Sequence, residues 1–338
     1  MTVPYVSTSL VDVSATTYKD LPYRALYKNE LEQPSGLFKL RGIAHCIQQA
    51  LRSNTAEGAS VHVYCSSGGN AGMAAAYASK QMGVPCTVVL PQTTKQLVID
   101  KLKDDLEAEV IVRGLHWGEA DAYLQKELIG LKGYPKAGSV YVHPFDNPVI
   151  WEGHASMIDE IVDQLNSEDD LGKVKGIVCS VGGGGLYNGI VEGLHRHESL
   201  KNVPVIAVET DQVPCFRDAV VKGEVVTLSG PFSTVATSLG SPYVSLKSLS
   251  NAQTHTTLNH VITETEALEG VVDYHDRFGT IVEPACGATL SLTSKVEVLN
   301  EILGIPLQAD DIIIYIVCGG KATNEALLEQ YRAMVCNK

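Results

Sequence analysis

The sequence Ser180-Val-Gly-Gly-Gly-Gly-Leu186 follows an apolar run, Gly176–Ser180, and precedes a segment whose apolar residues have helical spacing. This order of strand, glycine turn and helix is typical of α/β proteins. Glycine has no Cβ, so the N–H groups of such a turn can approach an anion closely, and the following helix adds partial positive charge. The turn predicts a phosphate site; the alternative is a tight turn that serves packing alone.

A second turn of this kind, Cys65-Ser-Ser-Gly-Gly-Asn-Ala-Gly72, lies in the other half of the chain. Ser67, Asn70 and the N–H groups of Gly68 and Gly69 predict a clamp for a carboxylate. The alternative is capping of the next helix by Ser or Asn, and the two roles are compatible. Two such turns indicate two α/β domains with a ligand in the cleft between them.

Short runs rich in Val and Ile alternate with helical segments along the chain, which predicts open, mainly parallel, twisted sheets flanked by helices. The stretch Leu228–Asn251 is rich in Ser, Gly and Thr and is expected to be irregular. The predicted strands are Ser60–Cys65, Pro85–Leu90, Glu109–Val112, Ser139–Val142, Gly176–Ser180, Pro204–Glu209 and Asp311–Val317. The predicted helices are Ala71–Met82, Lys95–Leu106, Trp117–Ile129, Ile150–Asn166, Leu186–His197, Glu264–Phe278 and Ala288–Leu303.

The amino-acid composition favours a globular protein and disfavours a nucleic-acid-binding or membrane protein. The 338 residues, 45% of them hydrophobic and 19% charged, are typical of a globular protein with two domains. The net charge of −13 disfavours nucleic acid and membrane surfaces as partners. No apolar stretch approaches the roughly 20 residues that span a bilayer, and no targeting segment opens the chain, so we expect a cytoplasmic protein. The eight cysteines form no C-x-x-C pair, which favours buried thiols over a zinc site.

Lys39 stands out because it lies between Phe38 and Leu40 in a segment that precedes a helix. A lone lysine is usually a solvated surface charge. Partial burial would instead lower its pKa and make its amine a nucleophile towards aldehydes.

The segment Ser35-Gly-Leu-Phe-Lys-Leu-Arg-Gly42 resembles the Schiff-base motif of the eukaryotic, fungal-like catabolic L-serine/L-threonine dehydratases. These are fold type II (tryptophan synthase β-like) pyridoxal-phosphate enzymes. The resemblance implies a large cofactor-binding domain, residues 1–42 and 145–338, and a small domain, residues 43–144. It continues in family order through Ser66–Gly72, His143-Pro-Phe-Asp146, Ile150-Trp-Glu-Gly-His154, Val181–Leu186, Val282-Glu-Pro-Ala-Cys-Gly-Ala288 and Val317-Cys-Gly-Gly320.

The resemblance implies an ammonia-lyase that binds pyridoxal 5'-phosphate (PLP), acts on a small amino acid, L-serine or L-threonine, and forms a homodimer. Lys39 would carry the cofactor as a Schiff base and act as the catalytic base. The residues implied to bind the cofactor are Phe38, Lys39, Asn70, Gly182, Gly183, Gly184, Gly185, Leu186 and Cys318. Those implied to bind the substrate are Ser67, Gly68, Gly69 and Asn70, and those for a monovalent cation, K⁺, are Glu209, Gly182, Val213, Leu239 and Ser241.

Two residues depart from the family pattern: Leu37 and Lys321 each stand where serine is usual. They keep open a catalytically weak PLP-binding paralogue with a regulatory or assembly role. β-Replacement or racemisation on the same fold is another alternative, disfavoured by Cys318 and by the Phe-Lys-x-Arg-Gly context. A Rossmann enzyme that binds NAD would need a glycine fingerprint that is missing, and it gives Lys39 no role.

Overall fold

A computed structural model of the chain describes residues 3–57, 60–130, 138–228 and 233–336. The chain divides into two compact units, each with its own sheet. The small unit comprises residues 1–6, 33–35 and 39–153, and the large unit comprises residues 7–32, 36–38 and 154–338. Each unit is the set of residues that pack mainly against one another. The domain boundaries predicted after residues 42 and 144 stay a prediction.

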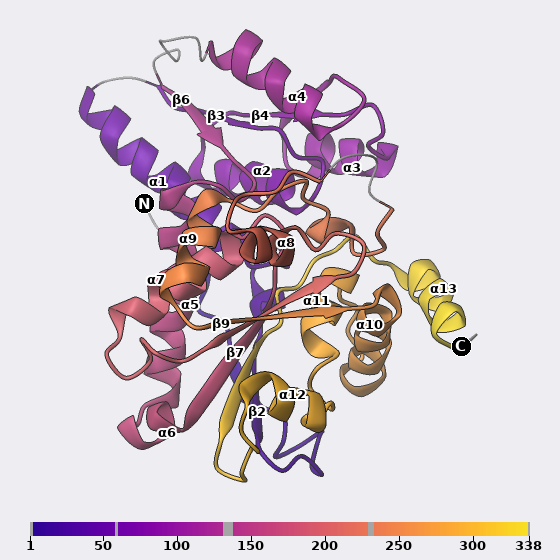
Figure 1. Ribbon diagram of the computed structural model, residues 1–338. Helices are drawn as coiled ribbons and strands as arrows, with labels where there is room; N and C mark the ends of the chain where they lie inside the picture. The colour runs from indigo at the N-terminus through magenta and orange to yellow at the C-terminus, as the bar shows by residue number, and fades with distance from the viewer. Residues whose placement is uncertain (1–2, 58–59, 131–137, 229–232, 337–338) are drawn as a thin grey trace. The chain divides into compact units, whose positions relative to one another are not determined.

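The small unit holds a parallel sheet of four strands in the order β5-β4-β3-β6. Every residue of the central strand β4 is buried, as expected for a parallel sheet covered on both faces. Figure 1 shows helix α2 lying against this sheet, with α1 beside it. The strands are β3 (His62–Cys65), β4 (Cys86–Leu90), β5 (Glu109–Val112) and β6 (Ser139–Val142); the helices are α1 (Lys39–Glu57), α2 (Asn70–Met82), α3 (Gln96–Asp100) and α4 (Trp117–Tyr123).

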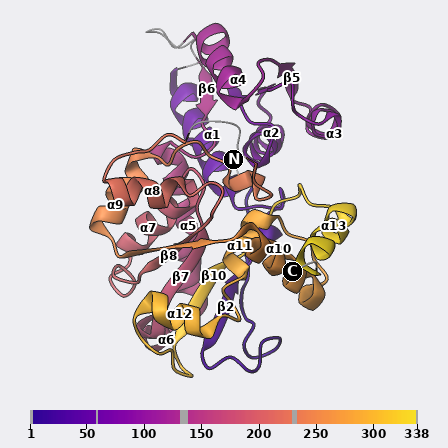
Figure 2. The same cartoon turned by 45° about the vertical axis from the view of Figure 1, so that its right-hand side comes forward.

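The large unit holds a sheet of six strands in the order β1-β2-β10-β7-β8-β9, in which only the β1 pairing is antiparallel. Figures 1 and 2 show helices on both sides of it, with α5 and α7 on one side and α10 and α11 on the other. The strands are β1 (Leu10–Asp12), β2 (Arg24–Lys28), β7 (Val174–Ser180), β8 (Val205–Thr210), β9 (Thr257–Ile262) and β10 (Ile312–Ile316). The helices are α5 (Pro148–Leu165, which begins in the small unit), α6 (Glu168–Lys173), α7 (Gly185–Arg196), α8 (Cys215–Lys222), α9 (Leu246–Thr254), α10 (Glu264–Phe278), α11 (Pro284–Leu290), α12 (Val296–Leu303) and α13 (Glu325–Cys336).

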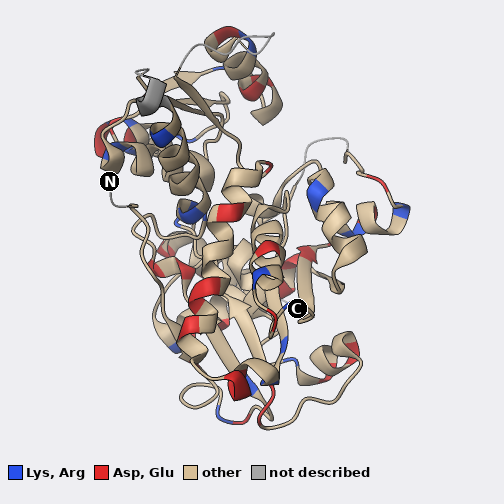
Figure 3. Cartoon of the chain, turned by 90° about the vertical axis from the view of Figure 1, so that its left-hand side faces the viewer, with Lys and Arg blue, Asp and Glu red and all other residues tan. Residues whose placement is uncertain are grey.

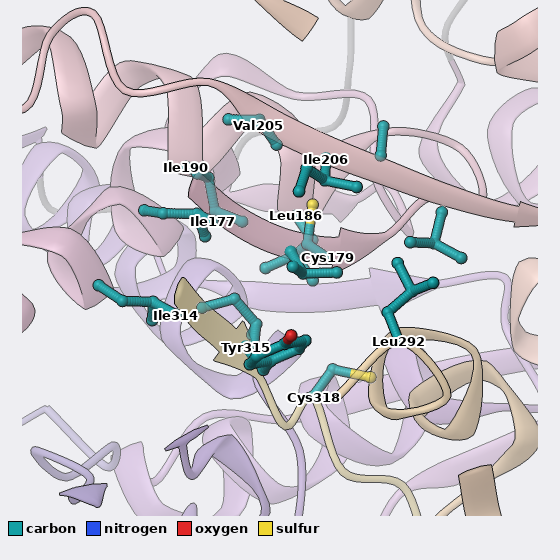
Figure 4. Close-up of a cluster of buried hydrophobic side chains, with 14 of the residues drawn as sticks. Ile177, Cys179, Leu186, Ile190, Val205, Ile206, Leu292, Ile314, Tyr315 and Cys318 are labelled. Carbon is teal, nitrogen blue, oxygen red and sulfur yellow. The ribbon is translucent and has the colours of Figure 1, made fainter. Parts of the chain in front are cut away.

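Aliphatic side chains from the central strands form the core of the large unit (Figure 4). Ile177, Ile206 and Ile314 come from three neighbouring strands and are fully buried. Each buried methylene contributes about 0.8 kcal/mol, so this layer holds the unit together. The sheet therefore forms a rigid base for the loops that follow its strands.

The predicted helix Ala288–Leu303 is wrong, because the chain forms two helices there, α11 and α12, with a break between them. Thr293 lies in the break and is anchored to the sheet from two sides. The Tyr23 hydroxyl donates to the Thr293 carbonyl oxygen at 2.7 Å, and the Tyr27 hydroxyl lies 2.9 Å from Thr293 Oγ1. These tertiary hydrogen bonds compete with those of a continuous helix.

Other differences are local, and the α/β fold class with mainly parallel sheets is confirmed. The predicted helices Lys95–Leu106 and Trp117–Ile129 exist, but their second halves are the π-helical segments η2 (Lys101–Asp105) and η3 (Leu124–Ile129). The stretch expected to be irregular, Leu228–Asn251, contains the start of α9, and its residues 229–232 lie outside the described residues. The elements that were not predicted are β1, β2, β9, α6, α8, α9, α13 and the 3-10 helices η1 (Glu30–Glu32) and η4 (Thr237–Leu239). Helix α1 was expected only as a helix after Gly42, and it begins at Lys39.

Surface charge and thiols agree with the composition. Figure 3 shows the acidic excess spread over many segments and mixed with basic residues. All eight cysteines are free, and all except Cys336 are buried. Within the described parts of the chain, no helix is both long and apolar enough to cross a membrane.

Candidate active site

Lys39 is the first residue of α1 and is half-buried in the small unit. Its Nζ donates a hydrogen bond to the Pro144 carbonyl oxygen at 3.1 Å. Burial raises the pKa of the Cys65 thiol, and the nearby Lys39 charge opposes this rise. Because Cys65 ends β3 and pairs with Val142 at the end of β6, the Lys39 amine lies near the carboxyl ends of parallel strands, where α/β proteins bind ligands.

The glycine turn after β3 is shaped by a close approach of backbone to backbone. A Cβ on Gly72 would lie only 1.8 Å from the Ser67 carbonyl oxygen, so the turn requires glycine there. The Gly69 N–H donates to Ser67 Oγ at 3.2 Å. The N-cap residue of α2 is Gly69, so neither Ser nor Asn caps the helix from that position. The helix end can therefore receive an anion.

Asp121 organises the same region, although nothing in the sequence pattern marks it as a functional residue. Its carboxylate accepts hydrogen bonds from Ser66 Oγ at 2.5 Å, from the Tyr141 hydroxyl at 2.6 Å and from Gln125 Nε2 at 2.6 Å. Burial raises the pKa of the Tyr141 hydroxyl, and Asp121 raises it further. The cluster ties the end of β3 to β6 and to the helical segment that follows α4.

In the large unit, the tetraglycine turn links β7 to α7. Gly184 has φ +91°, and a Cβ there would lie 2.0 Å from Ser248 Oγ, so only glycine fits. The Ser245 N–H donates to the Gly183 carbonyl oxygen at 3.1 Å and fixes the turn from outside. The N-cap residue of α7 is Gly184, which has no side chain to bond the first N–H groups of the helix, so these groups can face an anion.

Phe38 and Cys318 lie close together in the large unit, next to the strand that leads into the glycine turn. The Phe38 N–H donates to the Cys318 carbonyl oxygen at 3.2 Å. Cys318 lies just beyond β10 (Figure 4). Its thiol lies 3.9 Å from Ser180 Oγ at the end of β7. Phe38 also packs on the His154 ring, with 5.0 Å between ring centroids.

The two departures from the family pattern lie at this same place. Leu37 is buried and pairs with Gly319 in an isolated antiparallel bridge. The side chain of Lys321 covers Gly36, because a Cβ on Gly36 would lie 2.2 Å from Lys321 Cε. Both residues therefore pack around the segment that carries Cys318.

Glu283 is a buried carboxylate that the sequence did not single out as a functional residue. It accepts a hydrogen bond from the Ala322 N–H at 3.0 Å and another from Ser238 Oγ. Gly320 packs directly on its carboxyl group. Glu283 therefore holds the segment after Cys318 in place.

Glu209, one of the predicted cation ligands, is buried near the end of β8. Its carboxylate accepts N–H bonds from Phe216 at 2.8 Å and Arg217 at 2.7 Å. Burial raises its pKa to about 7, and these two N–H groups oppose the rise. Gly182 lies against Leu239, since a Cβ on Gly182 would be 3.2 Å from the Leu239 carbonyl oxygen.

A family model described as "Pyridoxal-phosphate dependent enzyme" matches residues 2–319. The chain belongs to this family. A catabolic L-serine/threonine dehydratase of Saccharomyces cerevisiae is 44% identical over 305 residues, which cover 90% of this chain and 84% of the relative. An L-serine dehydratase/L-threonine deaminase of Homo sapiens is 39% identical over 312 residues, 91% of this chain and 88% of the relative.

Among solved structures, a fungal L-serine ammonia-lyase from Rhizomucor miehei matches with a TM-score of 0.86 and 32% identity over 98% of both chains. A threonine deaminase isoform of Solanum lycopersicum matches with a TM-score of 0.80 at 21% identity, covering 99% of this chain and 84% of that one, and shows a shared fold. The sequence comparisons and the structural comparisons therefore both place the chain in the PLP-dependent family.

The residues of this PLP-dependent family member fit its cofactor. A phosphate needs N–H groups that no side chain occupies, and the uncapped glycine turn before α7 provides them. The aldehyde of the cofactor reacts with a lysine amine that is shielded from bulk solvent, and Lys39 is half-buried. In the small unit the structure places Lys39 and the predicted substrate residues, Ser67, Gly68, Gly69 and Asn70; in the large unit it places Phe38, Gly182–Leu186, Cys318 and the predicted cation ligands Glu209, Val213, Leu239 and Ser241.

We propose that K⁺ binds beside Glu209, and we expect it to stabilise this PLP-dependent enzyme above pH 7. The folded pKa of Glu209, about 7, lies above the ordinary value of 4.5, so its contribution to stability falls as pH rises between these values. A bound cation offsets this loss once the carboxylate is charged. Urea unfolding at pH 8 in KCl should give a free energy about 1–3 kcal/mol higher than in tetramethylammonium chloride.

At pH 5.5 the difference between the two salts should become small, because Glu209 keeps its proton in the folded state. Glu209→Gln should remove the difference at pH 8. Equal stability of the wild type in both salts at pH 8 would argue against a cation at this position.

Proposed function

We propose that this chain is an L-serine ammonia-lyase that also accepts L-threonine. The observation that carries the proposal is its 44% identity to an L-serine dehydratase of Saccharomyces cerevisiae over 87% of both chains. L-Serine loses its Cα proton and its Cβ hydroxyl group, as one water. Hydrolysis of the resulting imine takes up one water and gives pyruvate and ammonia, and L-threonine gives 2-oxobutanoate in the same way.

PLP, when bound, supplies an aldehyde for the substrate amine and a ring that accepts the electrons released at Cα. Lys39 Nζ is the group to which we assign removal of the Cα proton, because a half-buried amine near the strand ends is a suitable base. The loop after β3, with Ser67, Gly68, Gly69 and Asn70, binds the substrate carboxylate in this proposal. The uncapped end of α2 supports that assignment.

The same proposal gives the large unit the task of orienting the cofactor. Gly182–Gly185 and the Leu186 N–H would hold its phosphate, Phe38 would pack on its ring, Cys318 would face the ring nitrogen, and Asn70 would bond the ring hydroxyl. The backbone bond between Phe38 and Cys318 supports a common role for these two residues. A monovalent cation beside Glu209 belongs to the proposal as well.

An assay of products from purified protein with PLP tests the activity. With L-serine we expect pyruvate and ammonia in equal amounts, and with L-threonine 2-oxobutanoate. D-Serine from L-serine would instead identify a racemase, and cysteine from L-serine with sulfide would identify a β-replacement enzyme. A visible absorption band of bound PLP without any keto acid would favour the weak paralogue.

Three further features are proposed on the resemblance alone: a homodimer, a cytoplasmic location and a place in amino-acid catabolism that feeds gluconeogenesis. Light scattering of the purified protein measures the first directly.

A further inference from the structure

His143 lies just beyond the end of β6 in the small unit, and the proposed function gives it no role. Its ring is packed edge-on among three aromatic rings, those of Trp117, Tyr141 and Phe145, with centroids 4.6–6.0 Å away. Side chains on three sides leave the imidazole little freedom to rotate.

The imidazole of His143 acts as a hydrogen-bond acceptor for its own turn. Its Nδ1 accepts the N–H of Phe145 at 3.2 Å and the N–H of Asp146 at 2.7 Å. Since Nδ1 accepts two backbone donors, the proton of the neutral ring sits on Nε2. The bonds fix the two peptide units that follow Pro144, on either side of Phe145.

The carbonyl oxygen of Pro144 is the atom that receives the Lys39 amine, at 3.1 Å. Pro144 has no backbone N–H and a fixed φ, so the direction of its carbonyl depends on the peptide that follows it. The N–H of that peptide belongs to Phe145 and is held by His143. A continuous set of bonds therefore leads from the imidazole to the lysine amine within one unit.

We propose that His143 is a positioning residue for Lys39: through Nδ1 it fixes the turn whose Pro144 carbonyl oxygen holds the lysine amine. The proposal rests on the proposed role of Lys39, but it does not depend on which amino acid is the substrate. It gives the motif His143-Pro-Phe-Asp146 a physical task, namely to present one carbonyl oxygen to one amine.

The charges around the ring agree with a neutral histidine in this task. Burial lowers the pKa of His143 to about 4; the Asp121 carboxylate opposes this shift and the Lys39 ammonium adds to it. Asp146, on the same turn, has a pKa raised by burial. A neutral ring keeps Nδ1 free of a proton, so it can accept the two N–H bonds.

Two amide variants separate the roles of the two ring nitrogens. In His143→Asn the side-chain oxygen replaces Nδ1 and can still accept the turn N–H groups, whereas in His143→Gln the oxygen lies near the place of Nε2. The readout is the pKa of Lys39 in full-length protein from which PLP has been removed. It is obtained from the pH dependence of acetylation by acetic anhydride, measured on the Lys39 peptide by mass spectrometry.

We expect the pKa of Lys39 to fall by about 0.5–1 unit in His143→Gln, because an ammonium loses the carbonyl oxygen that favours its charged form. His143→Asn should stay within about 0.2 unit of the wild type. His116→Asn, at an exposed histidine of the same unit, is the control for a general effect of losing an imidazole.

Equal pKa values in wild type, Asn and Gln variants would overturn the proposal, and so would equal shifts in Asn and Gln. Either result would refute the positioning role of His143 and would leave the proposed enzymatic function untouched. Failure of the proposed function would appear elsewhere, as an unchanged PLP absorption band in Lys39→Ala. The two ideas can therefore fail separately.

Discussion

Lys39→Ala is expected to lose the visible absorption band of lysine-bound PLP and to lower kcat for pyruvate formation by about 10⁴-fold or more. A general base alone contributes up to about 10⁴-fold, and the same amine is proposed to anchor the cofactor. The methyl group of alanine cannot form a covalent bond with an aldehyde or take a proton from Cα. A spectrum of the purified protein and a coupled pyruvate assay measure both effects.

Lys39→Arg separates charge from nucleophilicity, because arginine keeps the positive charge but does not attack aldehydes. We expect it to be as inactive as the alanine variant. Lys80→Ala is the matched control: Lys80 lies in the same unit and pairs with Glu107 at 2.8 Å on the surface. Normal activity of Lys39→Ala beside normal activity of Lys80→Ala would remove Lys39 from the mechanism.

Gly184→Ala is expected to destabilise the protein by about 2–4 kcal/mol and to weaken PLP binding at least tenfold. An alanine at φ +91° costs about 1–2 kcal/mol, and its Cβ would lie 2.0 Å from Ser248 Oγ. Ser248 cannot move easily, because it is buried and bonds Asn188 Oδ1 at 3.0 Å and Ser245 Oγ at 2.8 Å. Displacement of the turn would therefore misplace the N–H groups that are proposed to receive the phosphate.

Urea unfolding and a PLP titration give the two quantities. Gly172→Ala is the control, since Gly172 lies in helix α6 of the same unit with open space at its Cβ position. It should be neutral or slightly stabilising. The double variant Gly184→Ala with Ser248→Gly should recover part of the stability, because it removes the contact but leaves the backbone strain. Wild-type stability and PLP affinity in Gly184→Ala would contradict this account of the turn.

The sequence predicted most of the parallel strands well, because they are short runs rich in Val and Ile. Glu109–Val112 and Ser139–Val142 have the bounds predicted for them. Strand β2 escaped prediction because it begins with Arg24 and ends with Lys28. Lys28 is completely buried, and its Nζ bonds Glu160 at 2.7 Å and the Thr8 carbonyl oxygen at 2.7 Å. A partner 132 positions away leaves no local signal in the sequence.

In the candidate site, too, residues with a local sequence signal were predicted and residues that act through long-range contacts were not. Lys39 and the two glycine turns could be chosen from the sequence, because an isolated lysine between apolar residues and a run of glycines are visible in one dimension. The turns were placed at strand ends, as predicted. Asp121 and the Pro144 carbonyl oxygen could not be identified as parts of the site from the sequence. The first acts through bonds to residues up to 55 positions away, and the second is a backbone atom that any residue carries.

Strand β2 lies beside β10 in the large sheet, where Leu26 pairs with Ile314. On the ribosome, β2 must therefore wait for roughly 290 further residues, which takes about 15–60 s at 5–20 residues per second. The small unit has all its segments once Gly153 has been made. A nascent or truncated chain can thus carry Lys39 while β2 still lacks its partner β10, and an unpaired strand edge can pair with another chain and aggregate.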